Sequence, residues 1–498
     1  MQRLLWVCFM FLAVGLLVAC DDEFDDLEVE DADFVTIADA EDVASPPTAV
    51  SATYEPDDCP FDVPRGYDIA CGYLTVPENR SKANAPDIYL AVAIVRARDG
   101  ATAPPIIYLA GGPGSSALDE FLADPEGWEY PFTRHRDLIL LDQRGTGYSQ
   151  PTLDCPEFDE ADEDENPDEL CYERLLNEGI DLAAYNTAEN AADVEALRLA
   201  LGIEQWDLLG ISYGTRLALA VMKQHPAGVR SVILDSVFPP NVDTPLEDVL
   251  STMAALNRLF AECEQDDYCA AEYPDLETVF LETVAWLNED EDVEIYGDDL
   301  LFAVSNAFND TELIPLLPYV IYEVADGNFA ALDEIGFESG YGRTAYQNDD
   351  ADYGDSEGMY NSVICHDEYA LGDYERVETA VVGQVPEELE AGLLQSAFDL
   401  TTVCAYWNPK QRTDNSPVAS SIPTLILAGQ YDVATPVHWA YLAAETLTNA
   451  YVYEFPGAGH ALLGGVTCAI DITAQFLDRP NAAPADSCIA EIAWPDFQ

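Results

Sequence analysis

A serine between two glycines is the first group of residues that could carry out chemistry. Ser212 stands in Gly210-Ile211-Ser212-Tyr213-Gly214, with a buried-strand pattern before it and an apolar helix pattern after it. Small residues at these positions permit the strained strand-to-helix turn that presents a serine hydroxyl as a nucleophile. An ordinary turn would use the same glycines, but the flanking strand and helix favour a nucleophile.

A serine hydroxyl is a weak nucleophile at neutral pH, so it needs a general base held by an acid. In enzymes with this kind of turn, the acid and then the histidine follow the serine along the chain. His460 follows the last strand pattern, where the base belongs, and we predict it as the base. The other histidines precede the serine, flank helices or lie in an insertion: His135, His225, His366 and His438.

Two aspartates beyond the serine end strand patterns and could serve as the acid. Asp432 follows the strand pattern at 423–428, and Asp235 ends the strand pattern directly after the serine. Some enzymes with this turn take the acid from the earlier position. We predict Asp432 as the acid and Asp235 as a structural carboxylate at the edge of the site.

The negative oxygen that forms during acyl transfer needs backbone N–H donors. One donor should be Tyr213, at the start of the helix after the serine. The other should come from the turn Gly111-Gly112-Pro113-Gly114, where we prefer Gly112 and then Gly111. A turn needed only for chain reversal requires the same glycines, so that alternative stays open.

The elements that would position these residues alternate between strands and helices from residue 100 onward. Thr187 can cap a helix that ends at Gly202, and another helix pattern follows Ser212. This alternation predicts a parallel sheet with helices on both faces, an α/β fold. Strand patterns occur at 104–110, 137–141, 206–211, 229–237, 423–428 and 451–455.

A long acidic and largely helical stretch interrupts the alternation. We expect a helical cap at 239–415, inserted between a first core part at 53–238 and a second at 416–498 with a C-terminal region. The cap would cover the carboxyl edge of the sheet, where open α/β sheets bind ligands.

The first residues have the pattern of an export signal. An apolar run follows Arg3 and ends in Leu17-Val18-Ala19-Cys20, which resembles the lipobox of bacterial lipoproteins. We expect a signal peptide at 1–19 and a lipid on Cys20 that anchors the chain to a membrane, facing outside the cytoplasm. An uncleaved anchor is the alternative, but the apolar run is shorter than the ~20 residues of a spanning helix.

Acidic residues dominate the composition. Asp and Glu number 94 against 20 Lys and Arg, which gives a formal net charge of −74. Such a surface repels nucleic acid, so we expect no nucleic-acid partner. Residues 20–52 are rich in Asp, Glu, Ala and Pro and predict an extended acidic tether.

Cysteines support export. Of the twelve, Cys8 and Cys20 belong to the signal, which leaves ten. An even number in an exported chain predicts disulfides, and neighbours in order would close short loops, although the sequence does not determine the pairing. No C-x-x-C pair is present, so we expect no metal, and no organic cofactor is implied. The ten are Cys59, Cys71, Cys155, Cys171, Cys263, Cys269, Cys365, Cys404, Cys468 and Cys488.

Four motifs follow one another along the chain, at 111–115 (Gly-Gly-Pro-Gly-Ser), 142–149 (Asp-Gln-Arg-Gly-Thr-Gly-Tyr-Ser), 210–216 (Gly-Ile-Ser-Tyr-Gly-Thr-Arg) and 429–436 (Gly-Gln-Tyr-Asp-Val-Ala-Thr-Pro). Together they resemble the prolyl and tripeptidyl aminopeptidase family of α/β-hydrolase serine peptidases. Ala110 stands where prolyl aminopeptidases usually carry histidine, which favours the secreted tripeptidyl-like branch. The acid loop and the tail from Cys468 to Cys488 resemble that branch too.

The resemblance implies an α/β-hydrolase fold and a peptidase that acts on peptides with a free N-terminus. Such an enzyme must bind an ammonium group, which cap carboxylates do in relatives. The segment around Asp367 and Glu368 resembles a cap motif of the branch, so these two are expected to bind substrate. An acidic surface near a disulfide is the alternative. The competing functions are a carboxylesterase or small-amide hydrolase with the same triad, and a binding lipoprotein that has lost catalysis.

Overall fold

The computed structural model describes most of the chain after the expected tether. The described residues are 52–161, 165–289, 293, 295–337, 355–368, 374–407, 414–492 and 495–497. The expected signal peptide, Cys20 and nearly all of the tether lie outside them. Within the described part, no helix combines the length and the apolar character that crossing a bilayer requires.

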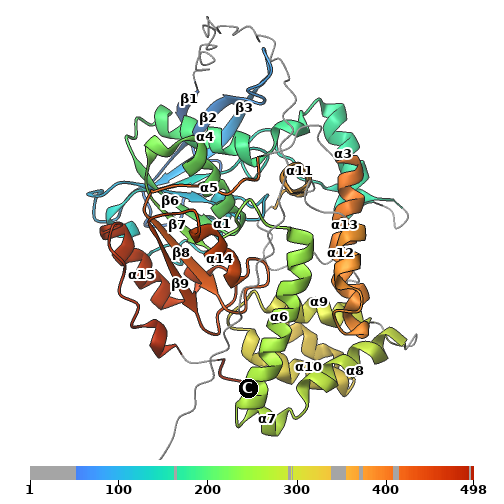
Figure 1. Ribbon diagram of the computed structural model, residues 1–498. Helices are drawn as coiled ribbons and strands as arrows, with labels where there is room; N and C mark the ends of the chain where they lie inside the picture. Colours follow the sequence, from blue (N-terminus) through green and yellow to red (C-terminus); the bar gives the residue numbers. More distant parts are fainter. Residues whose placement is uncertain are drawn as a thin grey trace, which may run out of the picture. The chain divides into compact units, whose positions relative to one another are not determined.

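A nine-stranded sheet forms the core, in the order β1-β2-β3-β5-β4-β6-β7-β8-β9 (Figure 1). The strands from β5 to β9 pair in parallel, as predicted. The sequence did not predict β1, β2 and β3, which add an antiparallel edge. The strands are β1 Thr53–Asp57, β2 Ile69–Pro77, β3 Asp87–Val95, β4 Ile106–Leu109, β5 Leu138–Leu141, β6 Trp206–Ile211, β7 Val229–Asp235, β8 Thr424–Gly429 and β9 Ala450–Phe455.

Helices cover both faces of the sheet because successive strand residues point in opposite directions. Leu208 packs in the core under α4 (Thr187–Ala200), α5 (Tyr213–Gln224) and α14 (Val437–Ala444). Its neighbour Leu209 packs in the opposite core, under α1 (Ala117–Ala123) and α15 (Thr467–Asp478). The α/β fold class predicted from the alternation is confirmed.

The start of α4 differs from the prediction by one residue. The cap is Asn186, whose side chain accepts a hydrogen bond from the Glu189 N–H at 3.0 Å. Thr187 is instead the first residue of the helix, and its hydroxyl donates to Asp367. Thr187 therefore does not cap α4, and its side chain instead joins α4 to the helix that ends at Asp367.

Helices fill the interval between β7 and β8, where the sequence analysis places the cap. Most of them enclose a separate hydrophobic core that includes Leu256, Phe280, Leu300 and Val320. Figure 1 shows them grouped beside the sheet. They are α6 Thr244–Gln265, α7 Cys269–Glu272, α8 Leu276–Glu289, α9 Gly297–Ala307, α10 Leu317–Ala325, α11 Glu357–Asp367, α12 Tyr374–Val381 and α13 Glu390–Tyr406.

A second segment, which the sequence analysis assigned to the core, packs with the cap helices α11 and α13. It follows β5 and contains α2 (Glu157–Glu160) and α3 (Pro167–Glu178). Asn361 on α11 donates a hydrogen bond of 2.8 Å to Asp168 on α3. The Tyr172 ring lies 5.9 Å from the Tyr406 ring of α13. Leu153, Leu175 and Val363 complete this contact in one buried cluster.

Disulfides join the ten predicted cysteines in sequential pairs. Cα atoms within each pair are 5.0 to 5.7 Å apart, which suits a disulfide. Such bridges persist in oxidising compartments, so the folded chain is an exported protein. The pairs are Cys59–Cys71, Cys155–Cys171, Cys263–Cys269, Cys365–Cys404 and Cys468–Cys488.

Candidate active site

Ser212 occupies a strained turn between β6 and α5. Its backbone has φ 53° and ψ −126°, a conformation that costs a non-glycine residue about 1–3 kcal/mol. A side chain at Gly214 would collide with the Leu109 carbonyl of β4, and one at Gly210 would collide with the Gly214 carbonyl. Packing therefore requires glycine at both positions, and the turn exposes the serine between them.

His460 and Asp432 meet at the carboxyl edge of the sheet. His460 lies in the turn after β9, and its Nδ1 is 2.9 Å from Asp432 Oδ2 in the turn after β8. Thr435 holds the acid in place, because its N–H and hydroxyl donate to the two Asp432 oxygens at 2.7 and 2.6 Å. The sequence analysis did not identify Thr435.

Electrostatics favour the charged form of His460. Burial alone would lower the pKa of His460, but the charge and hydrogen bond of Asp432 and the charge of Asp235 raise it above its usual value. Asp235 does not bond to the imidazole: its carboxylate accepts from the Leu462 and Leu463 N–H groups at 3.0 and 2.8 Å. Asp235 thus contacts the backbone directly after His460, and its role as a structural carboxylate stays a prediction.

The glycine turn after β4 lies against the nucleophile. A Cβ at Gly111 would be 3.3 Å from Ser212 Cβ, so the peptide between Gly111 and Gly112 is beside the serine. Tyr213 is the first residue of α5, where N–H groups lack acceptors within the helix. The cap supports the same turn, because the Ser356 N–H donates to the Gly114 carbonyl at 3.1 Å.

The loop at 142–149 forms hydrogen bonds to the residues on both sides of that glycine turn. Asp142 accepts hydrogen bonds from the Ser116 hydroxyl and the Leu118 N–H, both at 3.0 Å, at the start of α1. Gln143 donates to the Ala110 carbonyl at 3.1 Å, directly before the turn. Burial raises the pKa of Asp142 to about 7, although these donors oppose that rise.

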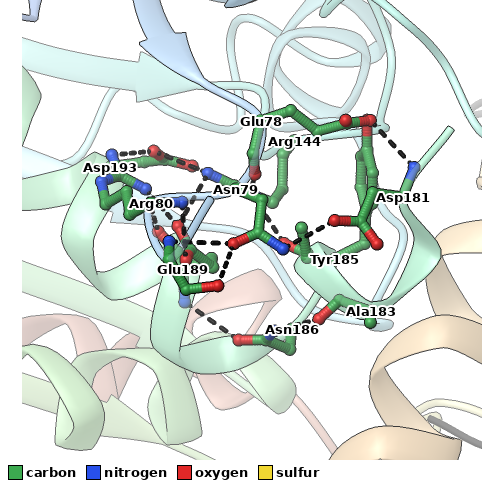
Figure 2. Close-up of polar contacts among 12 residues, drawn as sticks. Glu78, Asn79, Arg80, Arg144, Asp181, Ala183, Tyr185, Asn186, Glu189 and Asp193 are labelled. Atoms are coloured by element: carbon green, nitrogen blue, oxygen red, sulfur yellow. Dashed lines mark hydrogen bonds and ion pairs between the residues drawn. The ribbon is translucent and has the colours of Figure 1, made fainter. Parts of the chain in front are cut away.

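Arg144 fixes the same loop to the sheet and to α4. Its guanidinium is fully buried and binds Asp193 with two bonds of 2.8 and 3.0 Å. It also donates to the carbonyls of Glu78 and Ala184 at 2.6 and 2.7 Å. Figure 2 shows Arg80 approaching the same Asp193 carboxylate. Loss of one partner of such a buried pair typically costs 3–5 kcal/mol.

The two predicted substrate-binding carboxylates have different environments. Asp367 accepts from the Thr187 N–H at 3.1 Å and from the Thr187 hydroxyl, at the N-terminus of α4. Its other oxygen is 2.8 Å from His366 Nδ1. Burial would raise the pKa of Asp367, but His366 and Arg216 hold it below the usual value. Asp367 therefore joins α11 to α4.

Glu368 retains an unsatisfied oxygen. Its Oε2 accepts from the Thr244 hydroxyl at 2.5 Å, whereas Oε1 is buried and has no hydrogen-bond partner among the described residues. Arg216 Nη1 lies 3.7 Å from that oxygen. Nearby Asp248 on α6, which the sequence analysis did not identify, has a pKa raised to about 7 by burial and by the charges of Glu368, Glu247 and Asp243.

Two other features lie away from Ser212. A cavity of about 460 Å³ is lined by residues that include Thr187, Arg216 and Asn415, but not Ser212. Cys155, Glu157 and Cys171 lie close enough to share a metal ion. The two cysteines form a disulfide, so thiolate ligands are not available there.

Comparisons with known proteins agree with this geometry. Residues 104–269 match the family described as alpha/beta hydrolase fold, and 394–488 match the family described as TAP-like protein. Serine protease Hip1 of Mycobacterium tuberculosis is 25% identical over 461 residues, which cover 83% of this chain and 86% of that protein. Tripeptidyl aminopeptidase of Streptomyces coelicolor is 31% identical over 220 residues, 39% of this chain and 40% of that protein. Carboxylesterase B of Mycobacterium tuberculosis is 33% identical over 222 residues, which cover 40% of this chain and 42% of that protein. The chain therefore has the α/β-hydrolase fold and is similar to serine peptidases of the tripeptidyl aminopeptidase-like family.

Proposed function

We propose that this chain is a lipid-anchored aminopeptidase that cleaves peptide bonds near free N-termini. The observation that carries the proposal is the strained turn of Ser212 at the sheet edge that also bears the His460–Asp432 pair. His460 takes the proton of Ser212 as the hydroxyl attacks the carbonyl, and the Gly112 and Tyr213 N–H groups stabilise the oxyanion. His460 then protonates the leaving amine, and water hydrolyses the acyl-enzyme. Asp432 stabilises the charged imidazole throughout.

An aminopeptidase needs a negative group for the substrate's ammonium, and Glu368 with Asp248 suits that need. Both carboxylates have a pKa raised by burial, and Arg216 is the cation that offsets Glu368. The neighbouring acids are already paired, Asp243 with Arg376 and Glu247 with His438. An ammonium between Glu368 and Asp248 would relieve the unfavourable local charge. Asp367, engaged with Thr187, is the weaker candidate.

The anchor proposal predicts the response to acetylated substrate. Wild-type kcat/KM should fall about 10²-fold or more when the peptide's amine is acetylated, because a buried ion pair is lost. Glu368→Gln and Asp248→Asn should each remove most of that preference. The measurement is kcat/KM on free and acetylated versions of one peptide anilide.

Glu247→Gln is the matched control, because that acid is on the same helix but already paired with His438. It should keep the preference for the free amine. The preference should also weaken below about pH 7, where Asp248 becomes neutral. Equal cleavage of both peptides by the wild type would contradict exopeptidase action and favour an esterase or endopeptidase. Simple acyl esters assayed beside the peptide anilides distinguish an esterase from an endopeptidase.

The lipid anchor predicts where the protein fractionates. The pattern Leu17-Val18-Ala19-Cys20 supports acylation of Cys20 after export. Wild-type protein should sediment with membranes, and Cys20→Ser should move it to the soluble exported fraction. Cys8→Ser is the control, because it changes a signal cysteine and leaves the acylated one. Membrane association that survives in Cys20→Ser would mean a different anchor.

A further inference from the structure

Three residues in or beside the turns of the nucleophile and the base have a strained backbone. Five non-glycine residues among those described have positive φ, and three of them belong to these turns: Ser212, Ser236 and Ala461, at 53°, 60° and 58°. The other two are Asn84 and Asp275. The Ala461 N–H donates to the Ser236 hydroxyl at 2.9 Å. Each such backbone costs about 1–3 kcal/mol and persists only where its surroundings enforce it.

Asp235 is the residue that connects these turns. Its carbonyl oxygen accepts from the Ser212 N–H at 3.0 Å, at the nucleophile turn. Its carboxylate accepts from the Leu462 and Leu463 N–H groups at 3.0 and 2.8 Å, directly after His460. The side chain is fully buried. One residue thus bonds to the turn of the nucleophile and to the turn of the base.

We propose that Asp235 is a positioning residue that locks the His460 turn to the Ser212 turn, and that its charge sets the pH at which His460 can accept a proton. The inference rests on the proposed function, because it takes His460 to be the base. Both parts follow from one carboxylate. Its hydrogen bonds fix the turn, and its charge acts on the imidazole.

The buried charge of Asp235 is unfavourable for folding. Burial raises the pKa of Asp235 to about 6, although the Leu463 and Leu462 N–H groups and His460 oppose the rise. The other titratable groups that face it are Asp432, Tyr108 and Tyr130. Because this pKa is above that of an unfolded aspartate, Asp235 makes the fold less stable as pH rises from about 4 to about 6. The chain keeps a charge there that stability alone disfavours.

The same charge moves the acid limb of the pH–rate profile to higher pH. The charges of Asp432 and Asp235 raise the pKa of His460, so the base becomes active only above its usual range. Asparagine at 235 would remove one of these charges and lower that pKa. Its amide would also leave Leu462 or Leu463 without an acceptor, which would loosen the turn.

The test is the pH profile of kcat/KM for three variants. Asp235→Asn should lower kcat at least about tenfold and move the acid limb to lower pH. Ser236→Ala keeps the charge and loses the Ala461 hydrogen bond, so kcat should fall with the limb unmoved. Asp207→Asn is the control, a buried carboxylate paired with Arg230 at the start of β6, and should leave the limb unmoved.

Asp235→Asn that retains the wild-type kcat and acid limb would overturn the inference. If Ser212→Ala and His460→Ala stay active, the proposed function fails instead, and the two failures are therefore distinguishable. If Asp235→Asn does not fold, wild-type protein still decides the charge effect. The His460 ring signal followed by NMR should show a second inflection near pH 6 from Asp235, because coupled groups titrate together. A single inflection would overturn the inference.

Discussion

Ser212→Ala is expected to remove peptidase turnover by about 10⁶-fold, with the folded protein unchanged. Alanine has no hydroxyl to form the acyl-enzyme, and the remaining oxyanion donors give only residual catalysis. Stability should stay the same, because alanine takes the φ of 53° at a cost similar to that of serine. The measurements are kcat on a free-amine peptide anilide, labelling by a fluorophosphonate probe, and the unfolding temperature.

Ser231→Ala is the matched control. Ser231 is a fully buried serine on the neighbouring strand β7, and its hydroxyl donates to Asp207 at 2.5 Å, away from His460. It should retain turnover and probe labelling. Turnover and labelling that persist in Ser212→Ala would assign the nucleophile to another residue. If the wild type itself shows neither turnover nor probe labelling, the result would favour a binding protein without catalysis.

Local hydrophobic patterns predicted the parallel part of the sheet well. The runs before Ser212 and Asp432 became β6 and β8, because both strands are buried on both faces. The antiparallel edge was missed for two reasons. β1 is mostly exposed and carries no apolar signal, and β3 has an apolar run but no helix after it to mark a strand–helix repeat. The pairing of β1, β2 and β3 depends on register rather than local pattern.

Residues whose roles depend on chain order were accessible from sequence, and residues defined by tertiary contacts were not. Ser212, Asp432 and His460 follow strands in the expected order, and the structure brings Asp432 and His460 together. Asp367 and Glu368 are adjacent in sequence, but one meets the N-terminus of α4 and the other faces Arg216. Nothing in the local sequence distinguishes them, since the difference arises from packing between distant helices.

Asp432→Asn is expected to lower kcat by about 10⁴-fold, because an amide in that place favours the wrong imidazole tautomer. Thr435 contacts both carboxylate oxygens, so it should hold the asparagine in place and preserve the fold. The pKa of His460 should fall as well, because the charge of Asp432 contributes more to raising it than the charge of Asp235 does. The measurements are kcat and the acid limb of the pH profile.

The decisive comparison is with Asp235→Asn, which should lose far less activity. Asp432 bonds to the His460 imidazole at 2.9 Å, whereas Asp235 bonds to the backbone of the turn directly after His460. Removing the first changes the tautomer of the base, and removing the second changes only its position and pKa. Both variants should shift the acid limb to lower pH, but only Asp432→Asn should approach the loss caused by removing the base itself. The reverse ranking of activities would transfer the role of catalytic acid to Asp235.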